Sequence, residues 1–196
     1  MVTTEQIKAL RDETGVSVML CRKALEEAKE DFEKAKVILQ RKGADAAAKK
    51  MGRTLVAGTV AAYIHHSGSV GVLVELSSET DFVSGNEEFK TLARDIAMHV
   101  AAAKPEFLKR EDVTEETLSR AKEVLLKEVE GKPKAMQEKI LEGKLNSFFA
   151  EKILLEQPFV KNPDQTVRSL IENAIQRFGE KIEISRFTRF SVNDRP

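Results

Sequence analysis

The stretch TVAAYIHHSGSVGVLVEL, residues 59–76, decides the fold class. Apolar side chains recur at every second position in both of its halves, first at Val60, Ala62 and Ile64, then at Val70, Val72, Val74 and Leu76. A period of two is typical of β-strands. The pair Ser67-Gly68 between the halves is a turn signal. The stretch therefore predicts a β-hairpin with strands Thr59–His66 and Ser69–Leu76.

Helical patterns dominate the chain after this hairpin. A polar loop, Ser77–Ser84, leads to Asn86, which can cap a helix that ends before Pro105. Further helical patterns cover about 114–130, 133–152 and 166–178, with Gly131-Lys132-Pro133 between the first two and Gly179 after the third. The last segment, 182–192, predicts a strand with Ile182, Ile184, Phe190 and Val192 in phase. We expect an α+β domain with an antiparallel sheet and helices on one side.

The residues before the hairpin predict three short helices. Thr3 and Gln6 form a capping box for a helix over 3–14, and Gly15 suits the position after its end. Ser17 and Asp31 can cap the next two helices, and Gly43 is expected to stop the third. An Ala- and Lys-rich helical or flexible connector follows over 44–56. We expect two domains, a three-helix bundle with its linker at 1–54 and the α+β core at 55–196.

Charge, hydropathy and cysteine content exclude several classes of protein. The chain holds 32 basic and 32 acidic side chains, whereas a protein that binds duplex DNA through its phosphates is usually basic. The basic-aromatic stretch RFTRF at 186–190 is explained by alternation in a strand about as well as by nucleic-acid binding. We therefore expect no direct nucleic-acid contact, and no apolar run approaches the length of a membrane-spanning helix. The single cysteine, Cys21, favours a reducing compartment, the cytoplasm.

Enzyme motifs are missing from the sequence. It has no nucleophile elbow, phosphate-binding loop or dinucleotide fingerprint. Cys21 is expected inside the small bundle as a buried thiol. His65 and His66 are adjacent, and adjacent residues on a strand point to opposite faces, so the pair is not expected to chelate one ion. We predict no catalytic residue, no metal site and no cofactor.

Two apolar features are unusual for their positions. The stretch GVSVML, residues 15–20, crowds apolar side chains into a turn, where they can complete the bundle core or form a docking surface. Phe82 follows Asp81 in a polar loop, and the pattern alone favours a core position for it. An exposed Phe82 could instead wedge into a partner. These features indicate a two-domain interaction protein.

Several stretches, taken in order, resemble the bacterial elongation factor Ts family. The first are LRDETG at 10–15, Met19 and CRKAL at 21–25. ETDFV at 79–83 looks like the second signature of the family. Further similar stretches are AMHVA at 97–101, QPFV at 157–160 and RFTRF at 186–190. The likeness covers nearly the whole chain and is closest to the short forms that carry a single core subdomain.

The resemblance implies a nucleotide-exchange factor that binds elongation factor Tu, both GDP-bound and nucleotide-free, and acts by binding and not as an enzyme. It also implies that the N-terminal bundle is like a ubiquitin-associated domain and docks on the guanine-nucleotide domain. The matching docking positions are Lys8, Arg11, Val18 and Met19, although Val18 and Leu20 stand where Met and Asp are usual. Asp81 and Phe82, flanked by Thr80 and Val83, match the segment that inserts near the magnesium site. His65 matches a core histidine that touches the partner.

The single core subdomain leads to a further expectation, a homodimer. A second copy would restore the second core unit of longer relatives, through a free sheet edge at Ile182–Val192 or at the hairpin Thr59–Leu76.

The alternative function is an adaptor like a ubiquitin-associated domain, which binds protein through Val16–Leu20 without exchange activity. The segment Glu79–Val83 discriminates the two functions, because an adaptor would not need it.

Overall fold

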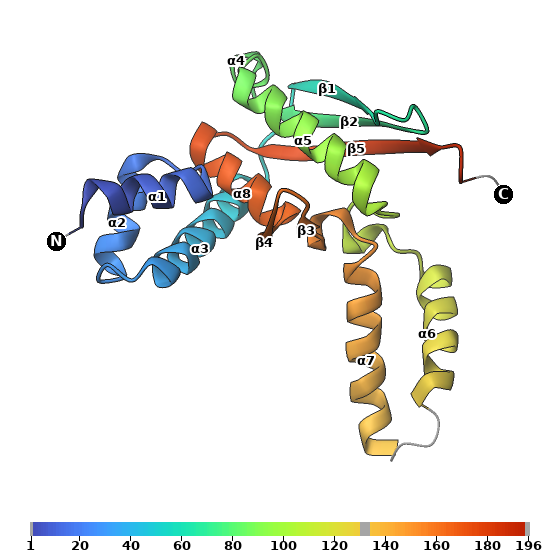
Figure 1. Ribbon diagram of the computed structural model, residues 1–196. Helices are drawn as coiled ribbons and strands as arrows, with labels where there is room; N and C mark the ends of the chain where they lie inside the picture. Colours follow the sequence, from blue (N-terminus) through green and yellow to red (C-terminus); the bar gives the residue numbers. More distant parts are fainter. Residues whose placement is uncertain (1, 130–133, 195–196) are drawn as a thin grey trace.

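The computed structural model describes residues 2–129 and 134–194 (Figure 1). The chain begins with three helices, α1 (Thr4–Thr14), α2 (Val18–Glu27) and α3 (Phe32–Lys50). All three predicted caps are present: the side chains of Thr3, Ser17 and Asp31 accept backbone N–H groups of the following turn. Gly15 ends α1 with a φ of 69°, in the left-handed region that favours glycine. The three-helix prediction is confirmed.

These helices enclose a small hydrophobic cluster of their own. Its buried members are Leu10, Val16, Cys21, Ala24, Leu25, Ala28, Ala35 and Leu39. Cys21 is a buried free thiol, as expected, and the protein around it raises its pKa through desolvation. The thiol donates a hydrogen bond to the Val16 carbonyl at 3.5 Å. Cys21 is therefore held protonated inside the bundle, away from any role as a nucleophile.

The expected end of the third helix at Gly43 is wrong. Helix α3 continues to Lys50, and Gly43 lies where α3 crosses α8 (Val167–Phe178). A Cβ atom at Gly43 would approach Gln176 Nε2 to 2.6 Å. The glycine thus permits the close approach of two helices instead of ending one. Residues 44–50 are helical, and the division into domains at 54/55 stays a prediction.

A three-stranded antiparallel sheet forms the centre of the molecule. Its strand order is β1 (Ala57–Ile64), β2 (Val70–Ser78) and β5 (Ile182–Ser191). The predicted hairpin is confirmed, but its turn lies one residue earlier than the Ser67-Gly68 signal suggested. The Gly68 N–H donates to the His65 carbonyl at 2.8 Å, and Gly68 itself has a φ of 68°.

The two faces of this sheet differ in what covers them. Ala61 pairs with Val74 and Tyr63 with Val72, so these residues share the inner face. Val60, Ala62 and Ile64 lie on the outer face of the sheet. The alternating residues of the second strand, Val70, Val72, Val74 and Leu76, lie on the inner face. The inner face packs against α5 (Glu87–Ala103), which Asn86 caps as predicted.

The expected phase of the last strand is wrong in its second half. Leu76 pairs with Ile184 and Glu75 with Arg186, which leaves Ser185 as an extra residue in β5. This β-bulge shifts the alternation by one position. Ile182 and Ile184 are buried on the inner face, whereas Phe190 and Val192 are exposed on the outer face.

Helices on the inner side of the sheet complete the core. Helix α8 starts at its cap Thr166 and ends at Gly179, as predicted. The main hydrophobic cluster joins the inner sheet face to α5 and α8, with Phe89, Ile96, Ile171 and Ile175 among its buried members. Antiparallel sheet and one-sided helices confirm the α+β fold class.

An antiparallel pair of helices projects away from the sheet, as Figure 1 shows. Its members are α6 (Glu115–Val129) and α7 (Lys134–Ala150). The predicted connection at Gly131-Lys132-Pro133 lies outside the described residues. Two short strands, β3 (Pro158–Phe159) and β4 (Asn162–Thr166), and two 3-10 turns, η1 (Arg110–Asp112) and η2 (Leu154–Glu156), were not expected. No helix within the described ranges is long and apolar enough to cross a membrane.

Candidate functional site

A four-residue helical turn, α4 (Asp81–Ser84), stands where the sequence predicted a polar loop. Phe82 at this turn is 85% exposed, so the core position that the pattern favoured is wrong. Asp81 beside it is exposed too, while Val83 is buried in the main cluster. Val83 therefore anchors the turn and offers no exposed side chain. We call residues 80–84 the tip.

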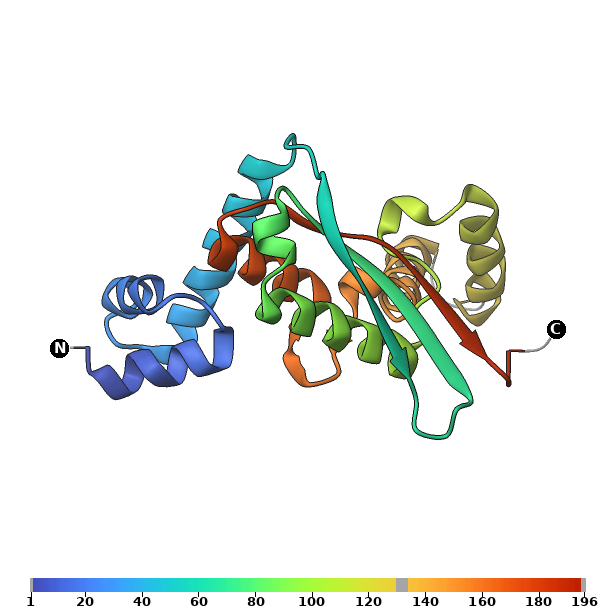
Figure 2. The same ribbon diagram turned by 90° about the horizontal axis from the view of Figure 1, so that it is seen from above.

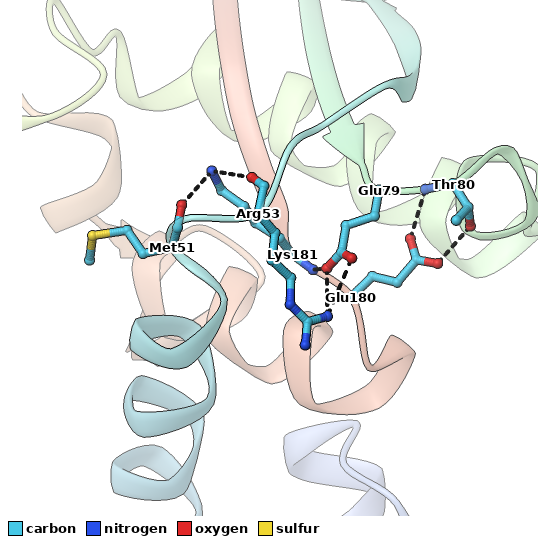
Figure 3. A network of polar contacts seen from close by, with 6 residues as sticks. All are labelled: Met51, Arg53, Glu79, Thr80, Glu180 and Lys181. Carbon is cyan, nitrogen blue, oxygen red and sulfur yellow. Dashed lines mark hydrogen bonds and ion pairs between the residues drawn. The ribbon is translucent and has the colours of Figure 1, made fainter.

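A carboxylate from a distant segment holds the start of the tip. Thr80 is the N-cap residue of α4, yet its hydroxyl makes no cap bond. The hydroxyl donates instead to Glu180 Oε1 at 2.6 Å, and the Thr80 N–H donates to Glu180 Oε2 at 3.0 Å (Figure 3). The last β2–β5 pair is Ser78 with Ile182, so the Thr80 N–H lies beyond the paired part of the strands. The Glu180 carboxylate satisfies this donor instead.

Glu79 makes the reciprocal contact in the same network. Its Oε1 accepts the Lys181 N–H at 2.5 Å, and Arg53 Nη1 donates to the same oxygen at 3.1 Å. The Lys181 N–H, followed by the Arg53 guanidinium, lowers the pKa of Glu79. Lys181 Nζ in turn donates to the carbonyls of Met51 and Arg53, just after α3. The tip, the α8–β5 turn and the end of α3 are thus joined by polar contacts (Figure 3).

The N-terminal bundle carries four of the predicted binding residues. Val18 is 52% exposed and Met19 is 67% exposed at the start of α2. Lys8 and Arg11, three residues apart on α1, are both exposed. In the crowded turn before α2, Val16 is fully buried. The turn therefore divides its apolar side chains between the bundle core and solvent.

His65 does not lie with the other predicted site residues. It is half-buried in the hairpin turn, where its Nδ1 lies 3.2 Å from the Tyr63 hydroxyl. The pairs Ala57–Ser78 and Ile64–Gly71 lie at opposite ends of the hairpin. At about 3.3 Å per residue the tip and His65 are separated by roughly 20 Å. Figure 2 shows the hairpin turn at the end of the sheet far from α4.

The expected position of His65 and His66 on opposite faces of a strand is also wrong. Both residues lie beyond the end of β1, and their ring centroids are 4.2 Å apart. Within residues 2–129 and 134–194, no group of three or more His, Cys, Asp and Glu side chains could hold a metal ion.

Sequence reasoning missed the residues that hold the tip. Glu180, Lys181 and Arg53 stand far from Thr80 in the chain and match no motif. Their nearness follows from the pairing of β2 with β5, which brings Ser78 opposite Ile182. Only a correct strand register, including the bulge at Ser185, could have placed Glu180 beside Thr80.

Comparison with known proteins shows the family of the chain. The family model described as Elongation factor TS matches residues 20–194. A protein of Carboxydothermus hydrogenoformans named Elongation factor Ts is 52% identical over 99% of this chain and 90% of its own length. Proteins of the same name from Acetivibrio thermocellus and Thermosipho melanesiensis are 51% and 46% identical, over 97% and 99% of this chain and 89% and 100% of their own lengths. With its α+β fold and matches along nearly the whole chain, the protein belongs to the elongation factor Ts family of translation elongation factors.

Proposed function

We propose that this protein is a guanine-nucleotide exchange factor for elongation factor Tu. It acts by binding in the cytoplasm, without enzymatic chemistry, a cofactor of its own, a membrane or direct nucleic-acid contact. The single observation that carries the proposal is Phe82, a large apolar side chain exposed beside Asp81 on an anchored turn. By the resemblance, this pair matches the one that inserts near the magnesium site of elongation factor Tu.

The proposed mechanism is differential binding. A protein shifts an equilibrium only by the difference between its affinities for two states. If it binds the nucleotide-free partner more tightly than the GDP form, reciprocity requires that it weakens GDP binding by the same factor. A bound divalent cation neutralises the diphosphate charge in such a site. Insertion of Phe82 and Asp81 beside the ion would displace its ligands and so destabilise the bound nucleotide.

The two exposed regions have different proposed roles. Lys8, Arg11, Val18 and Met19 form a docking surface on the bundle and contribute affinity. The tip produces the difference between nucleotide states, because it alone reaches the magnesium site in this proposal. His65 lies at the other end of the sheet and would contact the partner at a separate point.

Release of labelled GDP from elongation factor Tu tests the proposal. The expected result is faster release that saturates with increasing concentration of this protein. Binding without acceleration would support the adaptor alternative and overturn exchange. Adding excess magnesium should slow the accelerated release, because the ion competes with the insertion that the mechanism requires.

We also propose that the protein forms a homodimer, through a sheet face and not only an edge. The outer face carries exposed apolar side chains from all three strands or their ends, namely Val60, Ile64, Leu73, Phe190 and Val192. Ile64, Leu73, Phe190 and Val192 also line an open groove of about 580 Å³. A contiguous apolar patch of this kind is uncommon on monomeric proteins.

A second copy of the chain is the proposed occupant of this face. An apolar patch is complementary to itself under two-fold symmetry, so the same residues can serve both protomers. Sheets pack face to face at about 10 Å, with side chains interdigitated. The ion pair between Glu75 and Arg186 lies in the same row of the sheet as Val60 and borders the groove residues on one side.

Light scattering at micromolar concentration tests the dimer. The mass of two chains is expected for the protein and for Val37→Lys, a control that charges an exposed valine on α3. Ile64→Lys should give the mass of one chain, because it buries a charge in the proposed interface. The mass of one chain for the unmodified protein, with full exchange activity, would overturn the proposal.

A further inference from the structure

Two pairs of neighbouring residues, Glu79-Thr80 and Glu180-Lys181, bind each other at the end of the sheet, and each pair contributes one carboxylate. Glu180 accepts the N–H and the hydroxyl of Thr80, and Glu79 accepts the N–H of Lys181. Each pair therefore satisfies main-chain donors of the other. The contacts lie just beyond the last β2–β5 pair, Ser78 with Ile182, and continue the connection between the two segments after the ladder ends.

The tip is too short to fix its own direction. Within α4 the Gly85 N–H donates to the Asp81 carbonyl at 2.8 Å, and the Ser84 N–H donates to the Thr80 carbonyl at 3.3 Å. A single helical turn in isolation is unstable, because few hydrogen bonds offset the ordering of its backbone. The direction of Phe82 must therefore be set by the anchors on its two sides. One anchor is Val83 in the core, and the other is Thr80, whose N–H and hydroxyl bind Glu180 and whose carbonyl accepts the Ser78 hydroxyl at 2.9 Å.

Glu180 is the part of the Thr80 anchor that comes from a distant segment of the chain. Glu180 binds two donors of one residue through two oxygens, which fixes both the peptide and the side chain of Thr80. Hydrogen bonds to a carboxylate are stronger than those between neutral groups. Phe82 follows Thr80 by two residues, so a rotation of the Thr80 peptide would swing the exposed ring.

Lys181 extends the same anchor to the N-terminal bundle. Its main chain binds Glu79, and its ammonium group donates to the Met51 carbonyl at 3.0 Å and the Arg53 carbonyl at 3.3 Å. A cation at the carboxyl end of α3 also interacts favourably with the helix dipole. The segment Glu180-Lys181 thus contacts both the tip and the residues directly after α3, the third helix of the bundle.

We propose that Glu180 is a positioning residue for exchange: it holds Thr80 so that Phe82 and Asp81 point outward in the direction needed for insertion. The proposal rests on the proposed function only for the role of the tip, since the contact itself can be measured in the free protein. Glu180 need not touch the partner or the nucleotide. Its contribution should therefore depend on the presence of the Phe82 ring.

Amide hydrogen exchange in the free protein tests the contact. Glu180→Ala should raise the exchange rate of the Thr80 amide by about tenfold, because that N–H loses its acceptor. Glu180→Gln keeps one acceptor oxygen and should give a smaller increase. Glu183→Ala is the matched control, since it removes a nearby carboxylate that pairs with Lys181 and leaves Thr80 bound. An unchanged Thr80 amide in Glu180→Ala would overturn the positioning contact.

A double-mutant cycle on GDP release tests the consequence. Glu180→Ala should lower the saturating release rate by about tenfold, the size expected for a lost hydrogen bond to a charged group. In the Phe82→Ala background the same change should have a much smaller effect, limited to the positioning of Asp81. Equal losses in both backgrounds, with unchanged circular dichroism, would overturn the proposal. If the unmodified protein does not accelerate release, the proposed function fails, and the Thr80 amide still reports on the contact.

Discussion

The tip and the proposed docking surface on the N-terminal bundle both present apolar side chains to solvent, but they rest on cores of very different size. Phe82 stands above Val83, which belongs to the main cluster of sheet, α5 and α8. Val18 and Met19 stand on the bundle cluster, which has less than half as many buried members among the described residues. The bundle joins the rest of the protein mainly through α3, whose second half packs against α8.

The difference in core size fits the two proposed roles, a rigid tip and a bundle that contributes affinity. In the proposed function Phe82 enters a closed site and needs a fixed direction, which we propose that the large core and the Glu180 contact supply. A docking surface can tolerate local motion, because a small bundle folds marginally and can order further on binding. Four experiments test whether the two regions behave in this way.

The largest effect is expected in the bundle core. Leu25→Ala removes a fully buried side chain and should cost about 2–5 kcal/mol, more than a bundle of this size can lose. The bundle should unfold while the sheet core stays folded. Residue-resolved hydrogen exchange would show protection lost in α1 and α2 and kept in α5. A single cooperative loss of both regions would contradict the division into two folding units.

The next effect separates the two exposed sites. Phe82→Ala should lower the saturating rate of GDP release by about 100-fold, which corresponds to about 2.7 kcal/mol. The free energy of unfolding should change by less than about 0.5 kcal/mol, because the ring is exposed.

Met19→Ala is the matched control for Phe82→Ala, since Met19 is another large exposed apolar residue. It should weaken binding by about tenfold and leave the saturating rate unchanged. A large drop in melting temperature for Phe82→Ala, with normal release per folded molecule, would reject its role as a wedge.

The pH dependence of stability should differ between the regions, because His99 is buried in the core and residues 1–54 contain no histidine. Its Nδ1 accepts the Val160 N–H, and its Nε2 donates to Gln157 Oε1 at 3.0 Å, so the ring is neutral. Desolvation lowers the pKa of His99 below its usual value near 6.5. The unfolded chain therefore binds the proton more readily than the folded one.

The stability from His99 should be fully present above about pH 6.5 and fall as the pH drops toward the lower folded pKa. Between pH 7 and pH 5.5, protection factors, which correct for the slower intrinsic exchange at lower pH, should fall around α5 and change little in α1 and α2. In His99→Gln the core should lose most of this slope. A slope of the same size in that variant would assign the pH dependence to other groups.

The smallest effect concerns two glycines within helices. Gly143→Ala in α7 meets no atom within 4 Å and should stabilise the protein by about 0.5–1 kcal/mol through helix propensity. Gly43→Ala should gain less or lose stability, because its Cβ would displace the Gln176 amide that donates to the Leu39 carbonyl. Thermal unfolding of both variants measures the difference. An equal gain at both positions would show that the α3–α8 contact is loose.

Local signals in the sequence predicted most of the fold. Thr3, Ser17, Asp31 and Asn86 start helices as caps, because each acts through hydrogen bonds within its own turn. The predictions failed where a distant contact decides the structure. Gly43 was expected to end a helix by its own preference, but it lies inside α3 against α8.

The candidate site was predictable in part and for a similar reason. Motifs identified Asp81-Phe82 and Val18-Met19 as positions of interest, but the pattern could not say that Phe82 is exposed. Val83 turns inward to the main cluster and Thr80 binds Glu180, and both are contacts across the fold that no local pattern contains. Glu180 carries no local signal at all, because its partner stands about a hundred residues earlier in the chain.

The bulge at Ser185 absorbs one residue of β5 without changing which of the following residues face the helices. If Ser185 were deleted, Ile184 would stay opposite Leu76 and Arg186 opposite Glu75, so the pairing would become regular and every later side chain would keep its face. Deletion of a regularly paired residue would instead turn the side chains after it to the other face. In an alignment, a one-residue gap at Ser185 would therefore mark a protein with the same two sheet surfaces built on a regular strand.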